Sequence, residues 1–114
     1  MEGPVNIAIV GVGFGQQVHV PAFRNVPGCT IHSICARNLD RAKQAAQKLN
    51  IPGATNDWRQ LINDPGVQAL ALALPPSLQA EVALAAAEAG KHVFCEKPLA
   101  LTRAVGPSLL KLVP

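Results

Sequence analysis

The sequence has no tyrosine, only three phenylalanines and one tryptophan, and only three cysteines among its 114 residues. Those cysteines, Cys29, Cys35 and Cys95, are odd in number and far apart, which excludes a disulfide scaffold and leaves no paired ligands for a zinc site. No apolar run reaches the roughly 18 residues that a membrane span requires. We therefore expect a reduced, cytoplasmic chain without a targeting segment, a membrane contact or a bound metal.

Charged residues are also few, at 15% of the chain, and neither sign forms a run. Ten Lys and Arg against seven Asp and Glu give a net charge of +3, which suits a phosphate-bearing ligand but does not indicate a nucleic-acid partner. The hydrophobic fraction of 49% excludes intrinsic disorder. The length is sufficient for one domain with a single core.

Short apolar runs alternate along the chain with segments of helical periodicity. The runs have the length of buried strands and lie at 5–10, 30–36, 67–74 and 92–95, with room for a short edge strand within 53–56. Strands separated by helices form a parallel sheet through right-handed crossovers. We predict an α/β fold, a Rossmann-like doubly wound parallel sheet of about five strands in the order 3-2-1-4-5 with helices on both faces.

Two helices of this fold have features that the structure can test. The first follows the first strand, with a late start or a bend at Pro21, and its expected apolar face is formed by Val18, Ala22 and Val26. The last is expected over 77–89, with Ser77 as its N-cap and Gly90 after its end. Its expected apolar face is formed by Leu78, Val82, Ala85 and Ala89.

A glycine-rich loop directly follows the first strand and precedes a helix. Glycine at the first position permits a tight turn, and glycine at the third lets the backbone approach a pyrophosphate at the helix N-terminus. The loop predicts a dinucleotide site formed by Gly11, Gly13, Phe14, Gly15 and Gln16. Position 16 departs from the GxGxxG pattern, because it holds glutamine where the pattern has glycine. The alternative is a glycine-rich turn without a ligand.

The end of the second strand indicates which dinucleotide is bound. A site for NAD places an acidic residue there to bind the ribose 2′-hydroxyl, whereas this chain has Ala36, Arg37 and Asn38. Arg37 can pair with a 2′-phosphate, and Arg41 one turn later can share or replace that role. We therefore expect NADP in preference to NAD. The alternative for Arg37 is a solvated arginine in the first turn of a helix.

The remaining loops should meet the glycine loop, because ligands of such sheets bind beyond the carboxyl ends of the strands where the strand order reverses. After the fourth strand this rule selects Leu74, Pro75 and Pro76. After the fifth it selects Glu96, Lys97 and Pro98, and a charged pair at the end of a buried strand suits a cleft better than a core.

These segments resemble the N-terminal half of a known enzyme family. The glycine loop with His19 and Pro21, the turn Pro75-Pro76-Ser77 and above all GKHVFCEKPL at 90–99 are similar to the glucose-fructose oxidoreductase, inositol dehydrogenase and MocA (Gfo/Idh/MocA) family. The resemblance extends over about residues 4–102. It implies the dinucleotide-binding domain of a nicotinamide-dependent oxidoreductase that acts on sugars, cyclitols or related hydroxy and carbonyl compounds.

The resemblance also implies roles for single residues. The lysine that matches Lys97 lies between nicotinamide and substrate in the family, where its ammonium can stabilise or protonate the reacting oxygen. Glu96 would orient that lysine or contact the cofactor, and Pro98 would fix the turn. The alternative for Lys97 is a surface salt bridge with Glu96. His19 either faces the cofactor cleft or is structural, and Gln79 stands where the family often has histidine.

The family continues into a second, mixed-sheet domain that binds substrate, and the sequence contains no counterpart of it. We expect residues 1–102 to form the dinucleotide-binding domain and residues 103–114 a short tail or helix. Three functions remain open. The chain is the cofactor domain of an oxidoreductase that does not complete a turnover alone, or an enzyme that self-associates through surface left by the missing domain, or a nucleotide-binding module without catalysis.

Overall fold

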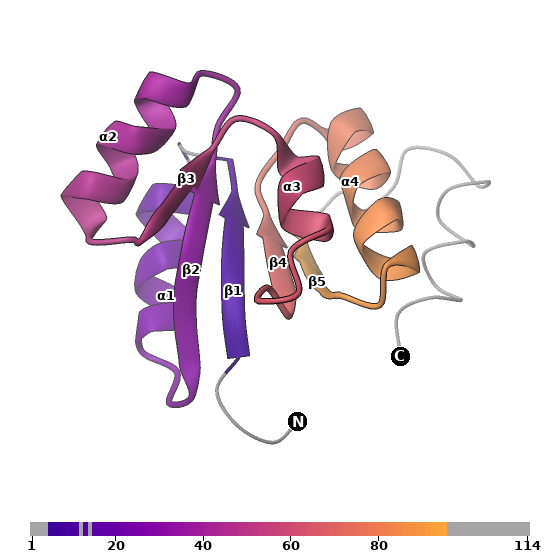
Figure 1. Cartoon of the computed structure of the whole chain (residues 1–114), viewed down its shortest axis with the longest axis horizontal. Helices are drawn as coiled ribbons and strands as arrows, with labels where there is room; N and C mark the ends of the chain where they lie inside the picture. The colour runs from indigo at the N-terminus through magenta and orange to yellow at the C-terminus, as the bar shows by residue number, and fades with distance from the viewer. Residues whose placement is uncertain (1–4, 12, 14, 96–114) are drawn as a thin grey trace.

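Five parallel strands form one sheet in the computed structural model, which describes residues 5–11, 13 and 15–95 (Figure 1). The hydrogen-bonded order is β3-β2-β1-β4-β5, so the predicted order 3-2-1-4-5 is confirmed. The strands are β1 Val5–Val10, β2 Cys29–Cys35, β3 Gly53–Thr55, β4 Ala69–Leu72 and β5 His92–Cys95. The fourth strand is shorter than the predicted 67–74, because only Ala69 to Leu72 pair with both neighbouring strands.

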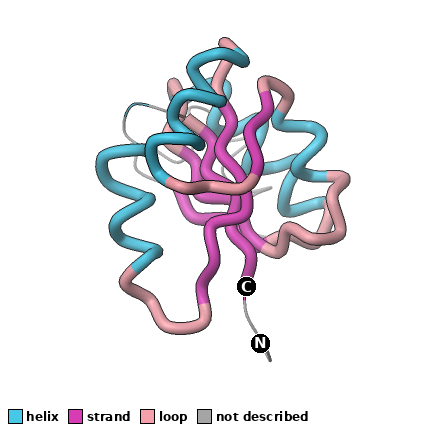
Figure 2. Tube along the Cα trace, turned by 60° about the vertical axis from the view of Figure 1, so that its left-hand side comes forward, coloured by secondary structure: helices cyan, strands magenta, loops and turns pink. Residues whose placement is uncertain are grey.

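Helices cover both faces of the sheet, which is the central layer in Figure 2. They are the π-helical turn η1 Gly15–His19, α1 Val20–Arg24, α2 Leu39–Leu49, α3 Trp58–Ile62 and α4 Pro76–Glu88. The two faces are built from alternate residues of β1. Ala8 and Val10 join the core under α3 and α4, whereas Ile7 and Ile9 join the core under α1 and α2. This alternation follows from the two-residue period of a strand.

The first helix presents a different face to the sheet from the predicted one. Val20 is buried, whereas Val18 is 41% exposed and Val26 is 45% exposed, so the predicted apolar face was wrong. The physical reason is the π-helical turn that ends at His19, since a wider turn shifts every later side chain relative to an α-helical pattern. Pro21 lies in the first turn of α1 and marks the late start that the sequence predicted.

Helix α4 begins one residue earlier than predicted and without a side-chain cap. Pro75 occupies the N-cap position and Pro76 the first helical position, so the prediction of Ser77 as N-cap was wrong. Proline suits this position because it has no N–H that needs an intrahelical partner. Gly90 follows the helix with φ +81, as predicted. The buried face consists of Gln79, Ala80, Val82, Ala83 and Ala86. The predicted face shares only Val82 with it, because alanines all around the helix give no unique apolar stripe.

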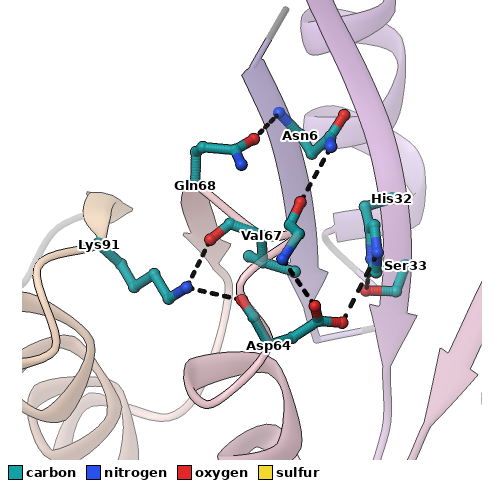
Figure 3. Close-up of polar contacts among 8 residues, drawn as sticks. Asn6, His32, Ser33, Asp64, Val67, Gln68 and Lys91 are labelled. Atoms are coloured by element: carbon teal, nitrogen blue, oxygen red, sulfur yellow. Dashed lines mark hydrogen bonds and ion pairs between the residues drawn. The ribbon is translucent and has the colours of Figure 1, made fainter.

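Polar contacts join the turn before β4 to β1, to β2 and to Lys91, the residue before β5, at the amino edge of the sheet (Figure 3). The Lys91 ammonium donates to the carbonyl oxygens of Asp64 at 2.7 Å and Val67 at 2.6 Å. The Asn6 side chain donates to the carbonyl of Gly66 at 2.9 Å, and the imidazole of His32 lies 3.7 Å from the Asp64 carboxylate. This edge is opposite the one on which the predicted site residues lie, so the contacts stabilise the fold without entering the site.

Two further findings concern the described part of the chain. None of its helices is long and apolar enough to cross a membrane. Its cysteines are all free thiols, and Cys35 and Cys95 end strands that are not neighbours. The tail predicted for 103–114 lies outside the described residues.

Candidate functional site

The glycine loop begins with a backbone that only glycine adopts without strain. Gly11 has φ +111, and a Cβ at this position would overlap the carbonyl oxygen of Ala73. The Gly11 N–H donates to the carbonyl of Cys35 at 2.9 Å, and the Ala73 N–H donates to the carbonyl of Val10 at 2.9 Å. The segments that follow β1, β2 and β4 are therefore fastened to one another at the carboxyl edge of the sheet.

Gly13 is a glycine for another reason. Its φ is not positive, and no described atom lies within 4 Å of where its Cβ would be. It lines a cavity, and a methyl group there would project into open space. The described fold therefore does not require glycine at position 13. A ligand that approaches this backbone closely would require it, as the pyrophosphate of a dinucleotide does.

A cavity of about 300 Å³ lies at the carboxyl edge, at the point where the strand order reverses between β1 and β4. Residues that follow four strands form its walls. They are Val10, Gly11 and Gly13 at the end of β1, Cys35, Ala36, Arg37, Asn38 and Arg41 at the end of β2, Asn56 and Trp58 after β3, and Ala73, Leu74, Pro75 and Leu78 after β4. Its size and position match the small-molecule sites of doubly wound folds.

The charge of this cavity is positive. Arg37 and Arg41 are the charged side chains among its described lining residues, and no Asp or Glu is among them. The Asn38 side chain accepts a hydrogen bond from the Arg41 N–H at 3.1 Å and thus caps α2. This cap fixes the backbone positions from which the Arg37 and Arg41 side chains extend. A phosphate-bearing ligand would meet the positive charges of Arg37 and Arg41 at the end of β2.

Cys35 lies in the wall of the cavity as a protonated thiol. Burial, and secondly the negative charge of Asp57, raise its pKa to about 11. Because the thiolate is the nucleophile of cysteine chemistry, Cys35 acts here as a small apolar surface. The described residues also contain no group of three or more His, Cys, Asp or Glu that could hold a metal ion.

Two contacts hold the apolar walls in place. The Gln79 side chain, which is buried in α4, accepts the Leu74 N–H at 3.1 Å and so fastens the segment after β4. On the other side, the Arg59 guanidinium lies over the Trp58 ring, 4.4 Å from its centroid. Trp58 is half-buried against the core under α3 and α4. Contacts from residues outside the cavity thus reach its walls at Leu74 and Trp58.

The structure brings together most of the predicted site residues that it describes. Gly11, Gly13, Ala36, Arg37, Asn38, Arg41, Leu74 and Pro75 all line the cavity. Gly15 and Gln16 lie in η1, and Pro76 is an exposed residue at the start of α4. Phe14, Glu96, Lys97 and Pro98 lie outside the described residues.

The sequence analysis missed Asn56 and Trp58. Both line the cavity and follow β3, whose carboxyl end lies at the same edge as those of β1 and β2. Ligands of such sheets bind beyond the carboxyl ends of the strands, and this rule also applies to the loop after β3. The end of β3 could not be placed from the sequence, because it is an edge strand of only three residues.

Comparison with known proteins agrees with this geometry. The model of an oxidoreductase family, described as an NAD-binding Rossmann fold, matches residues 5–113. The chain belongs to the Gfo/Idh/MocA oxidoreductase family. The resemblance seen in the sequence is thus confirmed, and the five-stranded sheet is the NAD-binding Rossmann domain of this family.

Relatives within the Gfo/Idh/MocA family are longer than this chain. Levoglucosan dehydrogenase from Pseudarthrobacter phenanthrenivorans is 38% identical in an alignment of 106 positions that covers 86% of this chain and 27% of that protein. Myo-inositol 2-dehydrogenase from Thermotoga maritima is 32% identical over 100 residues, 88% of this chain and 30% of that protein. The chain therefore spans less than a third of the length of these relatives.

Solved structures of the Gfo/Idh/MocA family superpose closely on the chain. A complex of levoglucosan dehydrogenase with NADH and levoglucosan has a TM-score of 0.89 at 35% identity, covering 96% of this chain and 32% of that one. A 3-ketoreductase from Actinomadura kijaniata, in complex with TDP-benzene and NADP, has a TM-score of 0.87 at 28% identity, covering 96% of this chain and 35% of that one. The neighbours thus include complexes with either nicotinamide dinucleotide.

Proposed function

We propose that the cavity at the carboxyl edge binds a nicotinamide dinucleotide and that it prefers NADP(H) to NAD(H). The observation that carries the proposal is the open space at Gly13, in a cavity of about 300 Å³ with two arginines in its wall. The Gly13 backbone would approach the pyrophosphate, and the adenosine half would extend toward the end of β2. Phe14, Gly15 and Gln16 complete the predicted loop, and Pro76 the predicted segment after β4.

The preference for NADP(H) rests on charge at the end of β2. Arg37 and Arg41 both line this part of the cavity, and none of the described lining residues is acidic. A guanidinium forms two charge-assisted hydrogen bonds with a phosphate. An acidic residue, which would bind the 2′-hydroxyl of NAD and repel a 2′-phosphate, is not found among these described wall residues.

The same proposal extends to the activity of the whole enzyme. The relatives are dehydrogenases of levoglucosan and inositol, so the substrate class proposed for the complete protein is sugars, cyclitols and related hydroxy or carbonyl compounds. The bound nicotinamide supplies hydride transfer. Lys97 would donate a hydrogen bond to the reacting oxygen, with Glu96 and Pro98 fixing its position. Since the chain spans less than a third of such relatives, we expect cofactor binding without complete turnover.

Titration of the tryptophan signal tests the cofactor proposal. Trp58 is the one tryptophan of the sequence and lines the cavity, so a bound reduced dinucleotide should quench its emission and receive energy from it. Saturable change with NADPH or NADH is the expected result. If calorimetry also detects no binding of NADPH or NADH, the proposal is overturned.

An arginine substitution tests the preference. Arg37→Ala should weaken NADPH binding about tenfold, which corresponds to about 1.4 kcal/mol, and leave NADH binding within about twofold. Lys43→Ala is the control, because Lys43 is an exposed cation of the following helix, α2, and does not line the cavity. Equal losses of NADPH and NADH affinity in Arg37→Ala would show that Arg37 does not bind the 2′-phosphate. A loss of NADPH affinity in Arg41→Ala alone would assign that role to Arg41.

A further inference from the structure

Three aromatic rings from η1, α1 and β5 meet one another, and none of them lines the cavity. The His19 and Phe94 rings are 5.4 Å apart at an interplanar angle of 83°. The Phe23 ring lies 6.3 Å from His19 at 68° and 5.5 Å from Phe94 at 89°. All three pairs have the edge-to-face geometry that aromatic rings favour. The shorter of the two His19 contacts is the one with Phe94.

His19 lies at the end of the helical turn in which the glycine loop continues. It is the last residue of η1, a single π-helical turn that begins at Gly15. Its side chain is 1% exposed, and the next residue, Val20, is buried in the core. Isolated π-helical turns occur frequently at functional sites. A shift of the glycine loop on binding a phosphate would therefore move the imidazole.

Phe94 lies one residue before the end of β5, at the edge of the sheet. It is 47% exposed, so its ring is held on one side only. In the sheet, Ala71 of β4 pairs with Ile9 on one side and with Phe94 on the other. Side chains at paired positions of parallel strands share a face, and the residue between the two larger ones is a fully buried alanine. This small side chain leaves room for a ring contact across β4.

We propose that His19 is a positioning residue that couples the glycine loop to the carboxyl end of β5 through its contact with Phe94. The inference rests on the proposed function, because it assumes that the loop binds the pyrophosphate of a dinucleotide. Its consequence is that phosphate binding at the end of β1 changes the packing around Phe94, one residue before the end of β5. The contact bypasses β4, which separates these two strands in the sheet.

ADP-ribose is the probe for this coupling, since it carries the pyrophosphate and adenosine of the cofactor and lacks the nicotinamide. In the wild-type chain, saturating ADP-ribose should shift the backbone amide resonances of Val93 and Cys95 in β5. In His19→Leu these shifts should fall at least fivefold, while the affinity for ADP-ribose stays within about threefold. If His19 served only in packing, His19→Leu would change stability and ADP-ribose affinity without a specific loss of the shifts in β5.

Two phenylalanine substitutions provide a matched pair. Phe94→Leu should abolish the response of β5, whereas Phe23→Leu, the same change in the same ring cluster, should preserve it. Phe94 is half-exposed, so this pair keeps the inference testable even where His19→Leu does not fold. Undiminished shifts in both His19→Leu and Phe94→Leu, or equal losses in Phe94→Leu and Phe23→Leu, would overturn the coupling.

The wild-type chain separates this inference from the proposed function. Binding of ADP-ribose without any response of β5 would overturn the coupling and leave the cofactor site intact. Failure of the wild-type chain to bind ADP-ribose, NADH and NADPH would overturn both.

Discussion

The Cα of Gly11 faces the carbonyl oxygen of Ala73 so closely that no side chain fits between the two loops. With φ +111, Gly11 also has a conformation that L-residues rarely adopt. We therefore expect Gly11→Ala to lower the free energy of unfolding by at least about 2 kcal/mol, since backbone strain and a backbone clash are both introduced. Urea denaturation followed by circular dichroism measures this loss. A variant as stable as the wild type would contradict the close approach of the two loops.

Gly13 should give the opposite result. With open space around its missing Cβ, Gly13→Ala should leave the free energy of unfolding unchanged or raise it by about 0.4–1 kcal/mol through lower entropy of the unfolded chain. Dinucleotide binding should nevertheless weaken at least tenfold, because the methyl group would occupy the space that we propose for the pyrophosphate. Calorimetric titration of this variant beside the wild type separates the two effects. Unchanged affinity would place the phosphates elsewhere in the cavity.

Lys91 stabilises the amino edge of the sheet through its two carbonyl partners. Lys91→Met keeps the aliphatic stem and removes the ammonium, which leaves the carbonyls of Asp64 and Val67 without this donor. We expect a loss of about 1–3 kcal/mol in the free energy of unfolding. Lys43→Met, on the exposed side of α2, is the control and should stay within about 0.5 kcal/mol of the wild type. Dinucleotide affinity should be the same in both variants.

The thiols of Cys35 and Cys95 make stability depend on pH in the alkaline range. Burial raises the pKa of each to about 11, from 9.0 in the unfolded chain, and the charge of Asp57 adds to the shift of Cys35. Between these values the folded chain holds more protons than the unfolded one, so its stability falls as pH rises. Denaturant titrations at pH 8 and pH 10.5 should detect this decrease, and the double variant Cys35→Ala/Cys95→Ala should reduce it. An equal decrease in the double variant would assign it to other groups.

The sheet and the candidate site could be predicted from the sequence where a single physical constraint acts. Buried parallel strands need apolar runs, and the reversal of strand order then places the loops of Gly11, Ala36 and Leu74 at one edge. The face of α1 could not be predicted, because the pattern of Val18 and its neighbours carries no mark of a π-helical turn.

Helix α4 shows a second limit of the same kind. Alanine residues lie on every side of this helix, so its apolar pattern does not select one buried face. Packing against the sheet decides that the polar Gln79 is buried. Its start was also misplaced, because Ser77 is a common N-cap residue and prolines at 75 and 76 already provide a start that needs no cap. Trp58 was overlooked as a site residue because the strand before it, β3, has only three residues.

The central place of β1 has a consequence for how the domain opens. β1 is bonded on both sides, to β2 and to β4, whereas β3 and β5 each have one neighbour among the described strands. Amide hydrogens of β1 should therefore exchange with solvent only when the whole domain unfolds, while those of the edge strands exchange through local opening. Gly11 directly follows this strand, so the backbone proposed to bind the phosphates would persist in partly opened forms that have already lost an edge of the sheet.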